Sequence, residues 1–174
     1  PELLVKNLPP SFELDLKIER PEIYYGEKTE AYVLVNTEAR EFDYPKGDKN
    51  VYSVYQGKGG VPIRSFLRKI LFAIEFLDPQ IFFTTYLTPE SRIMYNRRIR
   101  NRTALIAPFL DYDNDPYLVI SEGRLYWIQD AYTTSDMYPY SSGSYGLFEN
   151  KAVNYIRNSV KITIDAYNGE VNFY

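Results

Sequence analysis

Two short apolar runs at residues 117–121 and 124–128 are separated by Glu122-Gly123, and this pattern constrains the fold of the chain more than any other. A two-residue loop that contains glycine is typical of a tight β-hairpin. With Ser121 opposite Arg124, the facing pairs on one side are Ile120 with Leu125 and Leu118 with Trp127. Because both faces of this hairpin carry apolar side chains, we expect it to lie at the centre of a covered sheet.

A second hairpin is predicted near the C-terminus by Asn168-Gly169, a strong signal for a two-residue turn. Its register places Ala166 opposite Val171 and Ile164 opposite Phe173. We expect this face to point to the core, with Thr163 and Asp165 on the other face.

Further strands and two helices are expected before and between these hairpins. Apolar patterns predict strands at residues 11–19, 32–36, 40–45 and 51–55. Spacing of i, i+3, i+4 and i+7 predicts a helix over residues 63–77, with an apolar stripe made of Ile63, Phe66, Leu67, Ile70, Leu71, Ile74 and Leu77. Thr88 as N-cap, Pro89 at the first position and Glu90 in the first turn predict a second helix, over residues 88–106.

Three stretches are less regular. Residues 57–60, GKGG, lack the spacing of a phosphate-binding loop and are read as a turn. The apolar-aromatic run at 80–87 fits a buried strand or a short helix, and residues 133–149 are expected to form a long ordered loop. We therefore predict an α+β fold, a mostly antiparallel sheet with two central helices, in a single soluble domain over residues 1–174.

The composition excludes several functions. The chain has no His and no Cys, which removes zinc chemistry and Ser-His or Cys-His catalysis. A formal charge of -3 leaves no basic excess for a phosphate backbone, so no nucleic acid is expected as a partner. No run is long and apolar enough for a membrane span. Pro1 is not an initiator Met, so we expect a fragment of a larger protein.

An acidic stretch resembles a calcium loop. Asp111, Asp113 and Asp115 follow D-x-D-x-D spacing, and Glu122 stands at the twelfth position. The sixth position is Pro116, whose fixed φ cannot make the sharp turn of an EF-hand, so that motif is excluded. Two readings stay open: a looser hard-cation site, with calcium as the cofactor, or structural acids that pair with neighbouring arginines.

Five arginines precede this stretch, at positions 92, 97, 98, 100 and 102. They can bind an anionic lipid surface or polymer. The other reading, favoured by proximity in the sequence, is an internal electrostatic seam in which Arg97, Arg98 and Arg102 meet Asp111, Asp113, Asp115 or Asp130.

Trp127 and Asp130 complete the set of candidate binding residues. Asp130 together with Asp136 could support glycoside chemistry, with Trp127 and the many tyrosines as sugar platforms. Nothing in the spacing sets the separation that such chemistry needs. No catalytic residue is predicted.

Seven segments spread over nearly the whole chain are distinctive: IYYGE, EFDYP, YQGKGGVP, IAPFLDYDNDPY, GRLYWIQDAYTTS, YPYS and NYIRNSVK. Together they resemble an uncharacterised family of large bacterial membrane proteins, which have several N-terminal spans followed by a big extracytoplasmic region. The resemblance implies that this chain is part of that exterior region, on the extracytoplasmic side of the cell membrane, with the rest of the same protein as its partner. It implies no activity and no catalytic residues.

We therefore expect an extracytoplasmic portion of an integral membrane protein with a role in binding or assembly. The alternative is a carbohydrate-active or cation-binding module of the cell envelope. An open cleft that holds two or more acids beside exposed aromatics favours the alternative, and a closed, salt-bridged acidic loop favours the first.

Overall fold

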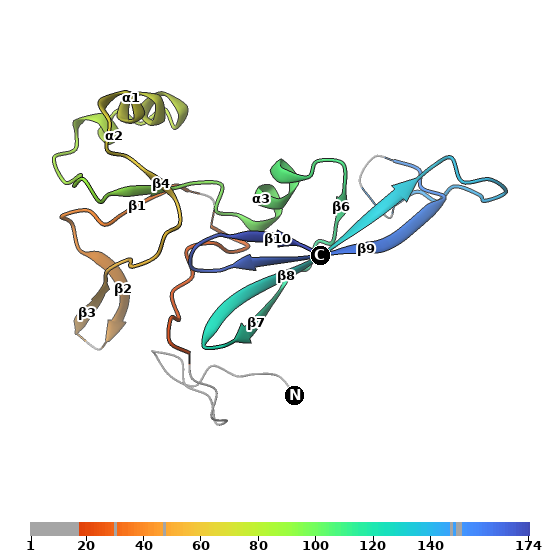
Figure 1. Cartoon of the computed structure of the whole chain (residues 1–174), viewed down its shortest axis with the longest axis horizontal. Coiled ribbons are helices and arrows are strands. Elements are labelled where there is room, and N and C mark those ends of the chain that lie inside the picture. The colour runs from red at the N-terminus through yellow and green to blue at the C-terminus, as the bar shows by residue number, and fades with distance from the viewer. Residues whose placement is uncertain (1–17, 30, 47, 147, 149–150) are drawn as a thin grey trace. The chain divides into compact units, whose positions relative to one another are not determined.

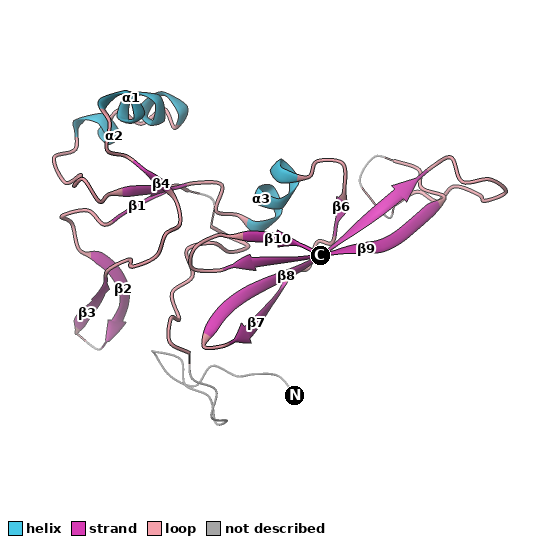
Figure 2. Ribbon diagram, in the orientation of Figure 1, coloured by secondary structure: helices cyan, strands magenta, loops and turns pink. Residues whose placement is uncertain are grey.

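The computed structural model describes residues 18–29, 31–46, 48–146, 148 and 151–174. It confirms the predicted α+β class with mostly antiparallel sheets (Figures 1 and 2). The chain divides into two compact units: among the described residues, unit 1 comprises 31–46 and 48–96, and unit 2 comprises 18–29, 97–146, 148 and 151–174. That the whole chain forms one domain stays a prediction. The strand predicted at 11–19 lies outside the described residues up to position 17.

Unit 1 is built on a three-stranded antiparallel sheet in the order β1 (Val33–Val35), β5 (Arg92–Met94), β4 (Val61–Pro62). A separate hairpin is formed by β2 (Glu41–Lys46) and β3 (Lys49–Ser53). These strands confirm the predictions at 32–36 and 40–45, while the strand expected at 51–55 begins and ends two residues earlier. The core of the unit is formed by Ile63, Ile81 and Ile93, which are essentially inaccessible to solvent.

Two helices cover this core, α1 (Phe66–Glu75) and the short α2 (Gln80–Phe83). Ser65 caps α1, because its side chain accepts a hydrogen bond from the backbone N–H of Arg68. The ambiguous run at 80–87 therefore begins as a short helix. Among the described residues, no helix is long and apolar enough to cross a membrane.

The side of α1 that meets the core is not the predicted one. Phe72, Ala73 and Phe76 pack against the isoleucine core, and Phe76 stacks on Tyr32 with a centroid distance of 4.7 Å. Most of the predicted core stripe faces outward instead: Phe66, Leu67, Leu71, Ile74 and Leu77 are all exposed. The helix is apolar on two sides, so the periodicity alone did not identify the side that packs.

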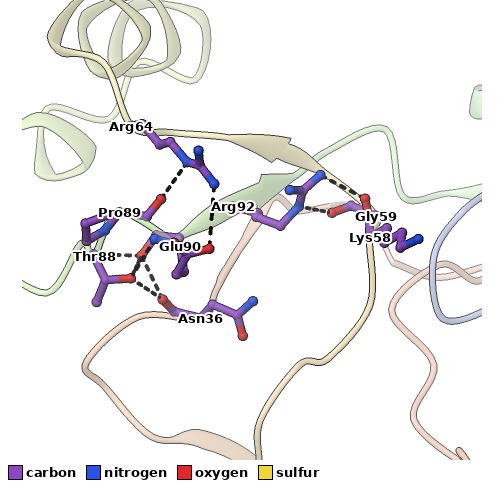
Figure 3. Close-up of polar contacts among 9 residues, drawn as sticks. Asn36, Lys58, Gly59, Arg64, Thr88, Pro89, Glu90 and Arg92 are labelled. Atoms are coloured by element: carbon purple, nitrogen blue, oxygen red, sulfur yellow. Dashed lines mark hydrogen bonds and ion pairs between the residues drawn. The ribbon is translucent and has the colours of Figure 1, made fainter.

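The helix predicted over residues 88–106 is wrong in its first half. Figure 3 shows that Thr88 and the backbone near it serve a turn: the hydroxyls of Thr88 and Ser91 both donate to the carbonyl of Asn36, at 2.8 Å each. The chain then enters β5, where Ile93 and Met94 are buried. Contacts across more than 50 residues therefore override a local signal for a helix start.

Arg92 of β5 fixes the neighbouring glycine-rich loop. Its guanidinium donates to the carbonyls of Lys58 at 2.8 Å and Gly59 at 2.6 Å (Figure 3). It also donates to the carbonyl of Gly60 at 2.9 Å. The backbone N–H of Gly59 donates to the hydroxyl of Tyr55. Residues 57–60 form an irregular loop with bends at Gly57 and Gly60, and the loop leads into β4 (Val61–Pro62).

Unit 2 is a five-stranded antiparallel sheet with one helix, α3 (Ile99–Ile106). The strand order is β10, β9, β8, β6, with β7 also paired to β8; the bounds are β6 Asp111–Tyr112, β7 Tyr117–Ser121, β8 Arg124–Ser135, β9 Tyr155–Asp165 and β10 Val171–Phe173. Ile99 of α3 packs with Ala131, Ile162 and Ile164 in the core of this unit. The predicted loop at 133–149 starts three residues late, because β8 continues to Ser135.

The register of the β7–β8 hairpin is confirmed, with Ser121 opposite Arg124 and Leu118 opposite Trp127. Its predicted central position holds only for β8, which lies between β9 and the two strands β6 and β7. β7 lies at the edge of the sheet, and Tyr117 and Leu118 are exposed. Because β8 is 12 residues long, its two ends pair with different short strands on the same side.

The C-terminal hairpin has the predicted inward face but not the predicted register. Ile164 and Ala166 are fully buried, whereas Val171 lies opposite Ile164 and not opposite Ala166. The loop is wider than two residues because the carboxylate of Asp165 accepts the backbone N–H groups of Tyr167 and Asn168, at 2.8 and 2.9 Å. A shift of two residues leaves every side chain on its predicted face, so Ile164 and Ala166 point inward as predicted. Asp165, which was predicted on the other face, is buried as well, at 4% exposed.

Candidate functional site

A cleft of about 690 Å³ lies within unit 2. Its walls come from α3, β6, β8, β9 and the segment between β8 and β9. The lining residues are Arg100, Tyr112, Asp113, Asn114, Tyr132, Tyr145, Gly146, Phe148, Lys151 and Ile156. The cleft thus combines aromatic rings, two cations and one carboxylate.

Asp113 is held in place by its backbone. Its N–H donates to the carbonyl of Asp130 on β8 at 2.9 Å, and its own carbonyl accepts from the side-chain amide of Gln129 at 3.0 Å. Gln129 is completely buried and also accepts a hydrogen bond from Thr103 of α3 at 3.0 Å. A satisfied buried network of this kind fixes geometry, so the position of Asp113 is determined by the core of the unit.

The side chain of Asp113 has two donors. One oxygen accepts the backbone N–H of Asp115 and the other accepts the hydroxyl of Tyr132, each at 2.9 Å. These bonds, the first more than the second, lower the pKa of Asp113 below its usual value, and the same contact raises the pKa of Tyr132. The cleft therefore presents a carboxylate that stays ionised beside a phenol that stays protonated.

Aromatic side chains form much of the rest of the lining. The rings of Tyr132 and Phe148 are 5.8 Å apart, and the ammonium of Lys151 lies 5.7 Å from the Phe148 ring. Tyr145 is 83% exposed. Ser144, next to it, exchanges two backbone hydrogen bonds with Val153, at 2.9 and 3.0 Å, which closes the loop that carries Tyr145. An exposed ring on a closed loop offers a flat apolar surface to a ligand.

The three acids of the calcium-like spacing do not converge. The Asp111 carboxylate pairs with Lys151 at 2.5 Å and accepts from Thr134, Asp113 bonds Tyr132, and Asp115 is exposed. Within the described part of the chain, no group of three or more acidic side chains is placed to hold a metal ion.

The predicted seam between arginines and acids is wrong. Asp130 pairs with Lys161 of the adjacent strand β9 at 2.5 Å, and this hydrogen bond is the main cause that raises the pKa of Lys161. Arg102 donates to the carbonyl of Gly169 at 2.8 Å and lies over the ring of Tyr25. Arg98 is the N-cap residue of α3. Two of the acids pair with lysines instead: Asp111 with Lys151 of the segment between β8 and β9, and Asp130 with Lys161 of β9.

A family described as "Uncharacterised protein family (UPF0182)" matches residues 1–174. The chain belongs to this family. UPF0182 proteins of Sulfurovum sp. and Pelotomaculum thermopropionicum are 57% and 51% identical to it, over 175 and 174 residues. A UPF0182 protein of Methanospirillum hungatei is 48% identical over 176 residues.

These alignments cover all of this chain but only 18–20% of each of those three relatives. The chain thus spans about a fifth of the length of the UPF0182 relatives it matches. No solved structure matches it.

Trp127 of this UPF0182 chain is placed in the fold and not in the cleft. Its indole N–H donates to the carbonyl of Tyr25 at 3.0 Å, and its ring packs against the core of unit 2. Of the residues singled out in the sequence, the cleft therefore contains Asp113 and Arg100, and Asp111 lies beside it through its pair with Lys151.

Lys151 and most of the aromatic residues of this UPF0182 cleft were not predicted from the sequence. Lys151 lies 40 residues from its partner Asp111, and no local motif marks it. The sequence did contain a signal for Tyr132. Asp130 precedes it by two residues on the same strand, so both side chains lie on one face of the sheet.

Replacing Tyr132 by phenylalanine should raise the pKa of Asp113 part of the way to its usual value, because one of its two donors is lost and the N–H of Asp115 remains. NMR titration of the aspartate carboxyl carbons measures this shift. Since the folded pKa is lowered, Asp113 stabilises the fold above its ordinary pKa of about 3.9, and this stability is lost as the pH falls through the lowered value.

Tyr145→Phe is the control for this substitution, because Tyr145 lines the same cleft and is not among the causes of the Asp113 shift. It should leave the pKa of Asp113 where it is. An Asp113 pKa that does not move in Tyr132→Phe would contradict the geometry of the cleft.

Proposed function

We propose that the chain is an extracytoplasmic portion of a larger integral membrane protein and that it acts by binding. The larger protein is supported by the relatives, which are about five times as long as the matched region. The extracytoplasmic side is supported by the motif resemblance set out above. The rest of the same protein is then the first partner.

The cleft of unit 2 carries the binding role. It brings a fixed carboxylate, Asp113, next to the tyrosine rings of Tyr132 and Tyr145 and the cation of Arg100. Ligand sites commonly combine an apolar lining with a few convergent polar groups. Such a lining suits a polar ligand with hydroxyl groups and a ring face, as a saccharide of the cell envelope has.

Binding is favoured over hydrolysis by the number of carboxylates. Glycoside hydrolysis commonly uses two acidic side chains on either side of the bond to be cleaved. Asp113 is the one acid among the described lining residues, and the nearby Asp111 is paired with Lys151. The same pairing disfavours calcium binding, because the carboxylates already have partners. We propose neither nucleic acid nor an anionic lipid surface as the ligand of this cleft.

Chemical-shift mapping with soluble cell-envelope saccharides tests the binding role. We expect shifts that concentrate at the lining residues and saturate with saccharide concentration. Tyr145→Ala should weaken this response, whereas Tyr174→Ala, which removes another exposed tyrosine (74% against 83%) outside the cleft, should not. Absence of shifts at the cleft, or equal losses in both variants, would remove the support for a saccharide site.

A further inference from the structure

Helix α1 is apolar on both of its sides. Seven of its ten residues, FLRKILFAIE, are apolar. Phe72, Ala73 and Phe76 pack on the core of unit 1, and Leu67, Leu71 and Ile74 follow i, i+4, i+7 spacing on another side. A helix that is hydrophobic all round is normally buried on all sides.

The outer side is nevertheless exposed among the described residues. We call it the α1 face: Phe66 (68% exposed), Leu67 (64%), Leu71 (55%), Ile74 (65%), Leu77 (88%) and Phe83 of α2 (76%). The face is continuous, because Phe66 contacts Phe82 and Phe82 contacts Phe83, at centroid distances of 5.3 and 5.1 Å. Figure 2 shows α2 beside α1 in this unit. Contiguous exposed apolar patches of this kind mark interaction surfaces.

The charges around the α1 face favour a protein surface over an anionic bilayer. Membrane-surface helices present free Lys and Arg toward lipid headgroups. Here the guanidinium of Arg64 donates to the carbonyl of Pro89 and that of Arg68 to the carbonyl of Pro62, both at 2.8 Å. Arg64 also pairs with Glu90, and the whole chain carries a formal charge of -3. Both arginines near the face are thus bonded to the fold, which leaves Lys69 as the further cation of α1.

We propose that the α1 face docks an apolar segment of the same polypeptide that lies outside these 174 residues. This inference rests on the proposal that the chain is a portion of a longer protein. About four fifths of the length of the relatives lies outside the matched region. A segment on the same polypeptide meets the face at high effective concentration, so no separate partner is needed to cover it.

Site-specific photocrosslinking in the full-length membrane-bound protein tests this interface. Leu71→p-benzoylphenylalanine places a crosslinker in the middle of the α1 face, and Ile74→p-benzoylphenylalanine repeats the measurement at a second position. Glu75, exposed on the same helix but polar, is the matched control position. Since all three side chains point to solvent in unit 1, the substitutions leave its core unchanged.

We expect positions 71 and 74 to crosslink to a peptide of the same polypeptide that lies outside the 174 residues, as identified by mass spectrometry. The crosslinker at position 75 should not give this product. A crosslink to lipid, to a second copy, to a different protein or to residues of these 174 would overturn the inference, and so would no crosslink at all. The size of the full-length protein and its protease accessibility test the proposed function independently of the crosslink. A failure of the α1-face interface can therefore be told apart from a failure of the proposed function.

Discussion

Gly169→Ala is expected to lower the free energy of unfolding by about 2–6 kcal/mol. Gly169 has φ +71°, and a side chain in such a strained backbone region costs about 1–3 kcal/mol. An added Cβ would also lie 2.5 Å from the ring of Tyr25, a residue that is only 1% exposed. Displacing a buried ring costs a further amount of about 1–3 kcal/mol. Urea denaturation monitored by circular dichroism measures the total.

Gly146 supplies the matched control for this substitution. It also has a positive φ, +93°, but an added Cβ meets nothing within 4 Å. Gly146→Ala should therefore show only the backbone cost. Equal losses of stability in the two variants would contradict the close packing of the C-terminal turn on Tyr25.

The second large effect is expected at the ion pair between Arg124 and Asp165. The carboxylate of Asp165 is 4% exposed and also accepts two backbone N–H groups of the loop. Arg124→Met removes the cation and leaves this buried charge without its partner, which should cost about 3 kcal/mol, at the low end of the usual range because the two N–H groups remain. The double variant Arg124→Met/Asp165→Asn should recover part of the loss, since no charge then stays buried.

An exposed pair elsewhere provides the comparison. Arg64 and Glu90 are 3.6 Å apart, with side chains 61% and 76% exposed. In Arg64→Met, loss of this ion pair should lower the free energy of unfolding by no more than about 1 kcal/mol. Loss of the hydrogen bond from Arg64 to the carbonyl of Pro89 adds its own contribution. Similar melting temperatures for Arg64→Met and Arg124→Met would show that burial does not distinguish the two pairs.

The parts of the fold that follow from local chemistry could be predicted from the sequence. The β7–β8 register depends on a two-residue loop with Gly123, and it was predicted residue by residue. The inward face of the C-terminal hairpin followed from alternation alone. Its register did not, because the side chain of Asp165 holds a wider loop than Asn168-Gly169 indicates.

Long-range contacts account for the errors in the fold. Thr88 has the chemistry of an N-cap, but its hydroxyl is used by Asn36, which is 52 residues away in the sequence. The outward stripe of α1 was mistaken for a core stripe because periodicity shows that a side is apolar without showing what covers it.

The same limit applies to the site. Asp113 could be identified as a candidate from its spacing, but its partner Tyr132 lies 19 residues away and the Asp111–Lys151 pair spans 40 residues. The sequence placed the acids next to the arginines that precede them. In the sheet, strand pairing brings lysines closer, and Lys161 meets Asp130 directly across β8 and β9.

We propose that this chain is the exterior part of a membrane protein, and protease accessibility in intact spheroplasts is the sharpest test of this proposal. The full-length protein should fractionate with membranes, and protease added outside should cut within these 174 residues while a cytoplasmic marker stays intact. Cleavage that appears only after the spheroplasts are lysed, or a full-length protein that stays in the soluble fraction, would contradict the account.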